Sequence, residues 1–305
     1  MTEELNQVLK ARRDKLDALR ERGVEPFAYA YDPTHSCAAA DAGFQEMEAA
    51  GALDEAGQGD TVRVAGRVMS WRSHGKSAFA DLEDGSGRIQ IYLRKSDIGD
   101  ASFDLLDLLD LGDWIGVAGR VGRTRMGQVT VFASEWTLLS KSLRPLPIGK
   151  VEVDEDSGER VVHSGFADTE ARYRQRYADL AVHPEVREVF RTRSRVISEM
   201  RRFLDERGFL EVETPVLQPV YGGALARPFR THHNALDMTL YLRIADELYL
   251  KRLVVGGFEK VYEIAKDFRN EGIDRFHNPE FTMLEFYEAF ADYEDMMRLI
   301  EELLV

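Results

Sequence analysis

The apolar residues between Thr61 and Leu138 follow a spacing that leaves few folds open to this part of the chain. They alternate with polar residues in short runs, which are separated by turn sequences such as Asp84-Gly85-Ser86-Gly87. A period of two is typical of β-strands with one buried face. Three such runs, a short helix at 103–111 and two further runs follow the order of an OB-type barrel. We therefore predict a five-stranded OB-type β-barrel over residues 61–140.

A different pattern begins after this region. Residues 141–160 contain two prolines, two glycines and several acidic residues, and the alternation ends there. From Pro184 to Gly208 the apolar residues take helical spacing. Strand-like runs are then expected at 209–214, 238–244, 260–268 and 281–290, and a final helix from Tyr293. The predicted fold class is α+β, with four parts: a helical extension at 1–60, the barrel at 61–140, a linker at 141–172 and a second domain at 173–305, an antiparallel sheet with flanking helices.

Composition limits the partners and the compartment of the chain. Its 305 residues include 40 Lys and Arg against 54 Asp and Glu, a net charge of −14. Such a balance does not mark a nucleic-acid binder, so any contact with nucleic acid requires a local patch. No apolar run approaches membrane-spanning length, the N-terminus lacks the apolar block of a signal peptide, and Cys37 is the one cysteine. We expect a cytoplasmic chain with no membrane contact and no internal disulfide.

Residues 3–22 are expected to form an amphipathic helix that ends at Gly23. Leucine and valine residues mark one face, and the other faces carry many lysine and arginine side chains. Two interpretations remain open: a solvated surface helix, or an arm that contacts nucleic acid.

The densest chemical signal lies in the strings Phe268–Gly272 and His277–Glu285. A strand, a polar turn and a returning strand would form a hairpin with Arg269 pointing into a cleft. The planar guanidinium of arginine forms paired hydrogen bonds with phosphate, and Phe281 offers a flat face to a base. The alternative is a hairpin whose charges simply pair with one another.

This region, FRNEGIDRFHNPEFTMLEFYEA at 268–289, resembles motif 2 of class II aminoacyl-tRNA synthetases, in the form found in the lysyl-tRNA synthetases of subclass b. The resemblance continues upstream over 221–268. Residues 193–217 are similar to motif 1, whose helix, strand and proline build the dimer interface of the family. The segments 172–180 and 62–93 also resemble this family. Aspartate and asparagine relatives lack the GGAxARPF…THHNALD string and the HNPEFT form of the hairpin.

The resemblance implies a lysine–tRNA ligase, which activates L-lysine with ATP to lysyl-adenylate and passes the lysyl group to tRNA(Lys). Attack of a carboxylate on the α-phosphate requires charge neutralisation and reactants held in line. By resemblance, Arg269 is the catalytic residue that contacts the α-phosphate and the lysine carboxylate. The implied ATP-binding residues are Arg269, Glu271, His277, Asn278 and Phe281, with Phe281 stacked on adenine.

A pocket for lysine should contain acids, because a buried ammonium without partners is costly. Glu247 and Glu285 fit this requirement, and Tyr287 lies on the same strand face as Glu285. By resemblance, Glu285 and Tyr287 lie near the side-chain ammonium, while Glu247 and the backbone of Gly223 lie near the α-ammonium. The implied lysine-binding set is Gly223, Glu247, Arg269, Glu285 and Tyr287. Without the resemblance, Glu247 would be interpreted as a surface acid on a helix.

In the barrel, Arg72, Phe79 and Gln90 match the positions that read the anticodon in the family. Aromatic stacking with a few contacts to base edges suits single-stranded RNA. The alternative for Phe79 is a place in the barrel core, because apolar residues alternate inward along this strand.

The chain also departs from the family pattern. No glycine follows Gly272, so the Gly-rich motif 3 with its ATP-binding arginine is not found. By resemblance, the carboxylates that bind Mg²⁺ would lie beyond residue 305. The pair His232-His233 has no further ligand at a suitable spacing, so no metal site is expected within the chain. Asp246 stands where the family often has proline, and Phe276 stands where a polar residue is usual.

We therefore expect these 305 residues to be part of a longer ATP- and Mg²⁺-dependent ligase that forms a homodimer through motif 1, and to be inactive on their own. The alternative hypothesis is a non-catalytic module that binds tRNA through the barrel and dimerises through motif 1. Lysine-dependent exchange of pyrophosphate into ATP separates the two.

Overall fold

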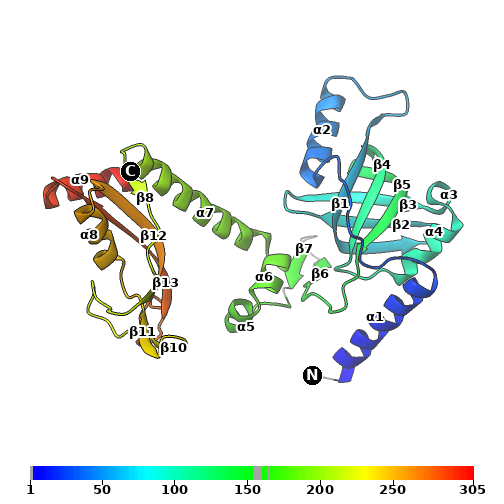
Figure 1. Ribbon diagram of the computed structural model, residues 1–305. Helices are drawn as coiled ribbons and strands as arrows, with labels where there is room; N and C mark the ends of the chain where they lie inside the picture. Colours follow the sequence, from blue (N-terminus) through cyan, green and yellow to red (C-terminus); the bar gives the residue numbers. More distant parts are fainter. Residues whose placement is uncertain (1–2, 154–159, 164) are drawn as a thin grey trace. The chain divides into compact units, whose positions relative to one another are not determined.

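The computed structural model describes residues 3–153, 160–163 and 165–305. It divides into two compact units, Met1–Pro184 and Glu185–Val305 (Figure 1). Each unit has its own hydrophobic cluster. Within the described ranges, no helix has both the length and the apolar character needed to cross a membrane.

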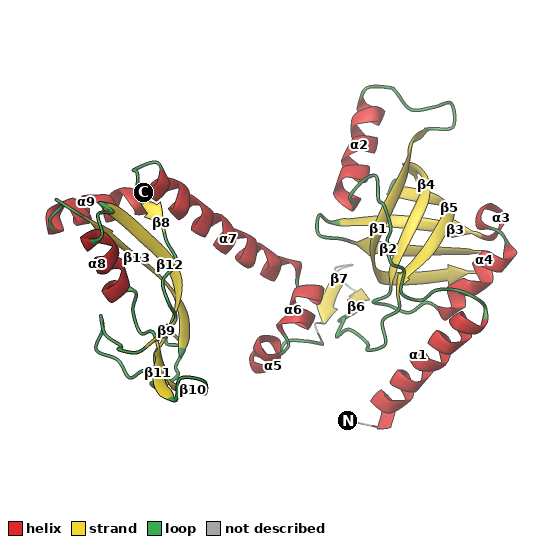
Figure 2. Cartoon of the chain, in the orientation of Figure 1, coloured by secondary structure: helices red, strands yellow, loops and turns green. Residues whose placement is uncertain are grey.

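The first unit is built on a closed five-stranded barrel with the strand order β1-β2-β3-β5-β4 (Figure 2). Strands β3 and β5 pair in parallel, and the other neighbouring pairs are antiparallel. The strands are β1 (Gln58–His74), β2 (Ser77–Glu83), β3 (Arg88–Arg94), β4 (Trp114–Arg123) and β5 (Val129–Ser140). The predicted five-stranded OB-type barrel is therefore confirmed, because alternate residues of each strand fill its interior.

Between β3 and β4 the chain forms three short helical pieces rather than one helix. These are α3 (Lys95–Ile98), α4 (Asp100–Asp104) and a 3₁₀ turn, η1 (Leu105–Leu108). The single helix predicted at 103–111 is wrong in extent, because Leu109 adopts an extended backbone with φ −77° and ψ 153°. Its side chain is buried in the barrel cluster together with Leu106.

Two helices precede the barrel, α1 (Glu3–Glu21) and α2 (Cys37–Ala49). Helix α2 starts at Ser36, whose hydroxyl accepts a hydrogen bond from the Ala39 backbone, and it contributes Phe44 to the barrel cluster. Helix α1 contributes Leu19 to the same cluster.

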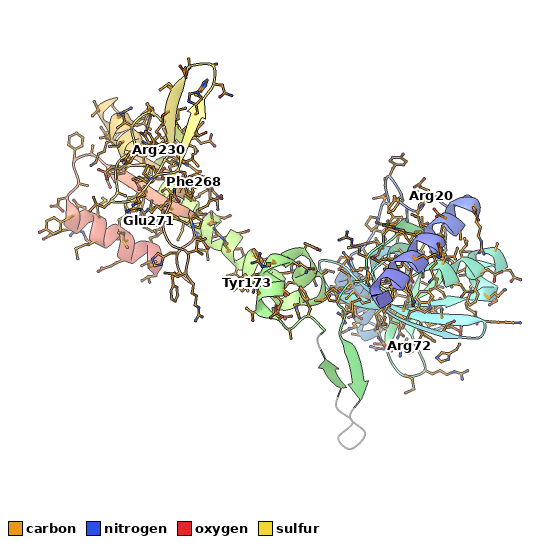
Figure 3. All side chains as sticks on the ribbon, turned by 90° about the horizontal axis from the view of Figure 1, so that it is seen from below. Arg20, Arg72, Tyr173, Arg230, Phe268 and Glu271 are labelled. Carbon is orange, nitrogen blue, oxygen red and sulfur yellow. The ribbon has the colours of Figure 1, made fainter. Side chains whose placement is uncertain are left out.

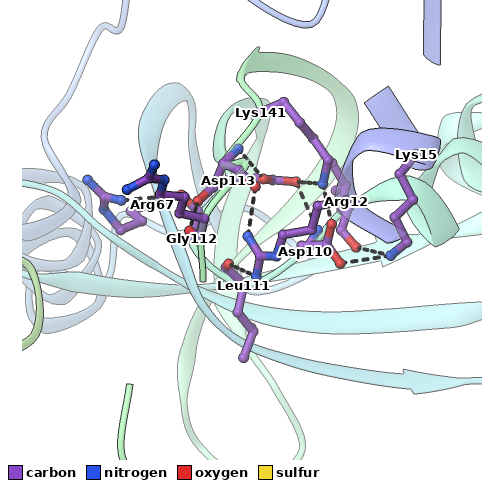
Figure 4. Close-up of polar contacts among 11 residues, drawn as sticks. Arg12, Lys15, Arg67, Asp110, Leu111, Gly112, Asp113 and Lys141 are labelled. Carbon is purple, nitrogen blue, oxygen red and sulfur yellow. Dashed lines mark hydrogen bonds and ion pairs between the residues drawn. The ribbon is translucent and has the colours of Figure 1, made fainter. Parts of the chain in front are cut away.

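Buried charges also hold α1 against the barrel (Figure 4). Arg12 donates to the backbone oxygens of Ser142 and Leu111 at 2.7 and 3.0 Å. Lys15 donates to Asp110 at 2.8 Å. These two basic side chains are used within the fold, so they are not part of a free basic arm. The exposed Lys10, Arg13 and Arg20 lie on the other faces of the helix, and the two interpretations of α1 apply to them.

The same junction contains a fully buried lysine, Lys141. Its ammonium donates to Asp113 at 2.8 Å and also to Asp110. Asp113 accepts the backbone N–H groups of Asp110 and Ser142 as well, at 2.8 and 2.7 Å. A buried ion pair is stabilised only when its remaining polar atoms are also bonded, and this pair meets that condition.

After the barrel come a short hairpin, β6 (Lys150–Val153) with β7 (Arg160–His163), and two helices, α5 (Thr169–Arg174) and α6 (Arg176–Val182). In α6 the buried Asp179 accepts hydrogen bonds from Arg172 and is 2.8 Å from His183. The linker predicted at 141–172 spans the hairpin and the start of α5. Its residues 154–159 and 164 lie outside the described residues.

The second unit begins with the long helix α7 (Pro184–Asp205) and contains two three-stranded sheets, in the orders β13-β12-β8 and β10-β11-β9. The main pair, β12 with β13, is antiparallel over nine residues of β12. The short strand β8 pairs with β12 in parallel, so the expected antiparallel sheet has one parallel edge. The other elements are β8 (Leu210–Glu211), β9 (Leu217–Gln218), β10 (Arg230–His233), β11 (Met238–Leu242), α8 (Glu247–Val255), β12 (Lys260–Phe268), β13 (Glu280–Glu288) and α9 (Tyr293–Leu304).

Helix α7 is anchored to this sheet by a small cluster of Leu204, Phe209 and Tyr262, all buried. The Tyr262 hydroxyl donates to Asp205 at the end of the helix, at 2.9 Å. Phe209 also meets Phe286 of β13 edge to face, with ring centroids 5.9 Å apart. This packing fixes the β12–β13 pair, from which the candidate site is built.

The ion pairs of Asp110 predict how stability responds to acid. Burial opposes ionisation of Asp110, but hydrogen bonds from Lys141 and Lys15 outweigh it and lower the pKa of the carboxyl. A group whose pKa is depressed in the folded state stabilises the protein above its unfolded pKa, and this contribution is lost as the pH falls through the folded value. We expect Asp110→Asn to cost about 1–3 kcal/mol near neutral pH and progressively less below about pH 4.

The three tryptophans, Trp71, Trp114 and Trp136, all lie in the first unit, so their fluorescence in urea reports this unit alone. Asp17→Asn at the exposed pair of Asp17 with Arg20 is the control, with an expected cost under about 1 kcal/mol at any pH. A cost of Asp110→Asn that is constant between about pH 7 and pH 3 would contradict the assignment.

Candidate functional site

The turn between β12 and β13 positions most of the chemical groups of the second unit. Arg269 follows the last residue of β12, and in the strand register Asp267 lies opposite Phe281 while Glu263 lies opposite Glu285. Because side chains alternate along a strand, Glu285 and Tyr287 share one face of β13. Figure 3 labels Phe268 and Glu271 at the start of the turn.

The turn encloses a hollow of about 540 Å³. All five residues assigned to ATP by the sequence line it: Arg269, Glu271, His277, Asn278 and Phe281. Phe276 lines the hollow too, with a largely exposed side chain. The five predicted side chains are thus brought together in one place.

Within this hollow Arg269 has an unused donor. Its guanidinium lies 4.9 Å from the ring centroid of Phe281, and one Nη donates weakly to the Ile244 backbone oxygen at 3.4 Å. Its Nε is buried and has no hydrogen-bond partner. A positive group with a free donor beside an aromatic face is suited to an anion attached to a flat ring.

Four contacts shape the turn itself. The Glu271 carboxylate accepts the backbone N–H of Arg227 at 3.3 Å, and the Asn270 backbone donates to the Arg227 carbonyl at 2.8 Å. On the other side, Asp274 accepts the backbone N–H of Phe276, which lowers the pKa of the Asp274 carboxyl, and it also pairs with His277 at 2.7 Å. The Asp274 contact therefore orients the imidazole of His277.

The residues assigned to lysine also lie together. Gly223 has φ +86°, and a Cβ there would come within 2.8 Å of the Glu247 Cβ, so only glycine fits. The Tyr287 hydroxyl is 3.4 Å from the Glu285 carboxylate. Burial and then the neighbouring Glu285 raise the pKa of Tyr287, and burial raises the pKa of Glu285. Glu247 pairs with Lys251 at 2.6 Å, and the ammonium of Lys251 lies 5.8 Å from the Tyr287 ring.

Beneath these residues lies a buried ionic group that the sequence analysis missed. Arg243, just after β11, is 2.7 Å from Glu263, 3.1 Å from Asp246 and 3.4 Å from Asp267. It also donates to the backbone oxygens of Thr214 and Lys266 at 3.2 and 2.9 Å. One feature of the sequence could have indicated this group: Arg243 is a charged residue among the apolar residues of the strand predicted at 238–244.

This group contains more acid than base. Burial, followed by the charge of Asp267, raises the pKa of Asp246 to about 8. Burial raises the pKa of Asp267 to about 6, against the opposing charge of Arg243. All four carboxylate oxygens of these two aspartates are buried without a hydrogen-bond partner.

Arg243→Ala would leave Glu263, Asp246 and Asp267 buried without their cation. We expect it to destabilise the second unit by about 3–5 kcal/mol. Hydrogen exchange of the β12 and β13 amides measures this opening. Arg201→Ala removes the exposed pair with Glu211 and serves as the matched control, with an expected cost of about 0–1 kcal/mol. Equal protection in the two variants would show that Arg243 does not organise the unit.

The barrel carries a second candidate site, for nucleic acid. Arg72, Phe79 and Gln90 line one hollow of about 380 Å³, and Figure 3 labels Arg72 on this unit. Phe79 is half-buried, whereas its neighbours Ala78 and Ala80 are buried in the barrel cluster. Phe79 therefore faces outward, and the alternative that placed it in the barrel core is wrong.

Phe79 belongs to a row of side chains that crosses four strands. In the strand registers Arg72 lies opposite Phe79, Phe79 opposite Tyr92, and Tyr92 opposite Phe132. The Phe79 and Tyr92 rings are 4.5 Å apart, and Tyr92 meets Phe132 edge to face at 5.8 Å. The sequence analysis missed Tyr92 and Phe132, which the alternation of the strands places on the outer face.

Gln90 lines this hollow with very little of its side chain exposed. It is almost completely buried, and its amide donates to Gln128 at 3.1 Å and accepts from Thr130 at 2.9 Å. Both contacts hold the amide in place, and Gln128 also lines the hollow.

Comparisons with known proteins match a family to part of each of the two units. Residues 168–305 match the family described as tRNA synthetases class II (D, K and N). Residues 62–139 match the family described as OB-fold nucleic acid binding domain. Residues 168–305 thus match a synthetase domain of the class II D, K and N group, and residues 62–139 match an OB-fold domain ahead of it.

Similar proteins of known name include several called lysine–tRNA ligase. It is 55% identical to that of Pelotomaculum thermopropionicum over 302 residues, 99% of this chain. It is 53% identical to that of Carboxydothermus hydrogenoformans, also over 99% of the chain, and 54% identical to that of Methanoculleus marisnigri over 96%. The family indicated by the sequence motifs is confirmed. The chain spans 55%, 57% and 54% of the length of these three relatives.

Proposed function

We propose that the chain provides the anticodon-binding barrel and the ATP- and lysine-binding hairpin of a lysine–tRNA ligase. The reaction is activation of L-lysine by ATP to lysyl-adenylate, with release of pyrophosphate, followed by transfer of the lysyl group to tRNA(Lys). The observation that carries the proposal is the position of Arg269, which lines the 540 Å³ hollow with a free Nε donor and also bonds to Ile244, three residues before Glu247.

In this proposal the hollow at the turn binds ATP. The adenine stacks on Phe281, while Glu271, His277 and Asn278 hold the adenosine. Arg269 then faces the α-phosphate and neutralises the charge that develops when the lysine carboxylate attacks. The same guanidinium orients that carboxylate, so both reactants are held by one group and the attack becomes effectively intramolecular.

Lysine is held at both of its amino ends. Glu285 and Tyr287 bind the side-chain ammonium, and Glu247 with the backbone at Gly223 binds the α-ammonium. The raised pKa of Glu285 supports this assignment, because a half-buried carboxylate gains most from a cationic ligand. Lys251, which pairs with Glu247, would exchange its partner for the ligand.

Further partners follow from the family. Mg²⁺ accompanies ATP in this reaction in the family, and no step above depends on that ion. A homodimer through motif 1 is supported by apolar side chains on α7, where Val189 and Val196 are 66% and 47% exposed. A cytoplasmic location fits a role in translation.

Arg269→Ala tests the nucleotide site. Loss of a charge-assisted hydrogen bond worth about 1.5–3 kcal/mol should weaken ATP binding about 10- to 150-fold in calorimetry. Where lysine-dependent ATP–pyrophosphate exchange is measurable, its rate should fall by about 100-fold or more. Binding of an anticodon stem-loop should stay unchanged. Arg275→Ala, which removes a guanidinium from the same turn, is the matched control; equal ATP affinity in all three proteins would refute the assignment.

Phe79→Ala tests the barrel. Stacking is worth about 1–3 kcal/mol per base, so binding of a U-rich anticodon stem-loop should weaken about 5- to 150-fold. ATP binding and the unfolding midpoint of the tryptophan signal should not change. Tyr29→Ala removes a fully exposed aromatic ring from the same unit and serves as the control. A drop in stability that matches the loss of RNA binding would mean that Phe79 only packs the barrel.

A second function is a tRNA-binding and dimerisation module without catalysis. The cross-strand row of Arg72, Phe79, Tyr92 and Phe132 favours it independently of the hairpin, because aromatic rings beside a cation suit the stacking of single-stranded bases. Tight binding of the stem-loop without lysine-dependent ATP–pyrophosphate exchange by the 305-residue chain would support the module. Exchange by this chain would support the ligase.

A further inference from the structure

The first unit contains another hollow, of about 700 Å³, which no step of the proposed reaction uses. It is larger than the hollow at the β12–β13 turn, and none of its residues lines the hollow of Arg72, Phe79 and Gln90. Strands β1, β4 and β5 form its floor and sides with Arg63, Gly116, Ala118, Glu135, Trp136 and Thr137. The hollow is therefore a separate feature of the barrel.

A short segment of chain forms one wall of this hollow. Backbone hydrogen bonds tie the chain to β5 at Ala28 and to β1 at Thr34, each at 2.9 Å. Residues 29–33 therefore cross β4, which lies between these two strands in the barrel. The Tyr31 ring packs on Gly116, where a Cβ would come within 2.3 Å of a ring atom. The wall is thus fixed at both ends and near its centre, so the hollow is formed before any ligand binds.

Opposite charges lie on the two sides of the floor. In the strand registers Arg63 lies opposite Ala118, and Ala118 lies opposite Glu135, so the three side chains share the outer face of the barrel. Neighbouring strands are about 4.8 Å apart, which places the backbones of Arg63 and Glu135 about 10 Å apart. The Arg63 guanidinium lies 4.8 Å from the ring centroid of Tyr31, and the next residue of the wall is Asp32. One carboxylate therefore comes from the wall beside the cation, and the other comes from the far side of the floor.

None of these three charged groups is paired within the protein. In the part of the chain that the structure describes, the side chains of Arg63, Asp32 and Glu135 form no hydrogen bond and no ion pair. Two exposed arginines of β4, Arg120 and Arg123, instead both pair with carboxylates. A cation and two carboxylates that share one hollow without pairing are available to a ligand.

From this arrangement we propose that the hollow binds a free diamino acid such as L-lysine. Arg63 pairs with the ligand's carboxylate and Asp32 with its α-ammonium, while Glu135 across the floor pairs with its side-chain ammonium. The aliphatic stem of the ligand lies over the methyl group of Ala118 and against Trp136. One positive and two negative groups of the protein thus meet one negative and two positive groups of the ligand.

The same charges disfavour a nucleotide or RNA at this place, because a phosphate beside Arg63 would also face two carboxylates. The site lies in the first unit and does not rest on the proposed ligase function.

Tryptophan fluorescence of the 305-residue chain tests the proposal, because Trp136 lines the hollow and all three tryptophans lie in the first unit. L-Lysine should change the signal saturably, with a dissociation constant below about 5 mM. Arg63→Gln and Glu135→Gln should each weaken binding at least about fivefold. Glu46→Gln, which changes an exposed acid of α2 away from the hollow, should bind as the wild type does.

Urea unfolding followed by the same tryptophan signal covers binding that leaves the fluorescence of the folded chain unchanged. A ligand that binds the folded state raises the unfolding midpoint, so saturating L-lysine should raise it in the wild type and less in Glu135→Gln. If the three groups are only solvated surface charges, L-lysine causes neither a saturable signal nor a higher midpoint. That result, or equal affinity in the wild type and both glutamine variants, would overturn the proposal.

Nα-Acetyl-L-lysine distinguishes a free amino acid from the C-terminal lysine of a peptide, because it keeps the carboxylate and the side-chain ammonium but lacks the α-ammonium. It should bind the wild type at least about fivefold more weakly than L-lysine does, and the difference should disappear in Asp32→Asn. Binding of the acetylated form that equals or exceeds that of L-lysine would assign the hollow to a peptide terminus and overturn the proposal.

Ala118→Leu keeps every charged group but fills the floor of the hollow. Since Ala118 lies on the outer face of β4, this change should leave the urea midpoint without ligand nearly unchanged and abolish the response to L-lysine. A response that persists in Ala118→Leu would place the ligand elsewhere and overturn the proposal.

Glu247→Gln separates this site from the lysine pocket of the second unit. It should weaken L-lysine binding there and leave the tryptophan response of the first unit unchanged. Loss of the tryptophan response in Glu247→Gln would mean that the signal arises from the second unit, which would overturn the present proposal. A normal tryptophan response in a chain whose second unit binds no lysine would refute the lysine pocket alone and support the site on the barrel.

Discussion

The second unit depends on one buried guanidinium. Arg243 joins the end of β11 to two positions of β12 through Glu263 and Asp267, and to the segment after β8 through the Thr214 carbonyl. The two small sheets have no strand pairing with each other, so these bonds hold one sheet against the other. Buried charge therefore stabilises the region in which Arg269 contacts Ile244 and Phe281, where most small domains would use apolar packing.

The first unit also contains a buried ionic cluster, in which the fully buried Lys141 lies between Asp110 and Asp113. There the charges are balanced and every acceptor is bonded, so the cluster serves to dock α1. Around Arg243 three carboxylates share one guanidinium, and the oxygens of Asp246 and Asp267 have no hydrogen bond. The two clusters are buried to a similar degree, but only the one around Lys141 is fully hydrogen-bonded.

The sequence predicted the barrel, the long helix α7 and the β12–β13 pair because their periodicity is local and strong. It also indicated the five residues that line the hollow at the turn, since they lie within 13 residues of one another. It missed the Arg243 group, whose members lie just after β11, just before α8 and in β12, and meet only in three dimensions. It likewise left Tyr92 and Phe132 out of the row around Phe79, because the parallel pairing of β3 with β5 is not visible in any single run.

The row of Arg72, Phe79, Tyr92 and Phe132 limits the sequence changes that this surface can accept. Its side chains face outward because Ala78, Ala80, Ile91 and Val131 fill the barrel. A one-residue insertion in any of these strands would invert every following side chain and bury the aromatic rings. The interior therefore keeps this row on the outer face, and substitutions at its margins, at Arg72 or Gln128, change the surface of the hollow without loss of the fold.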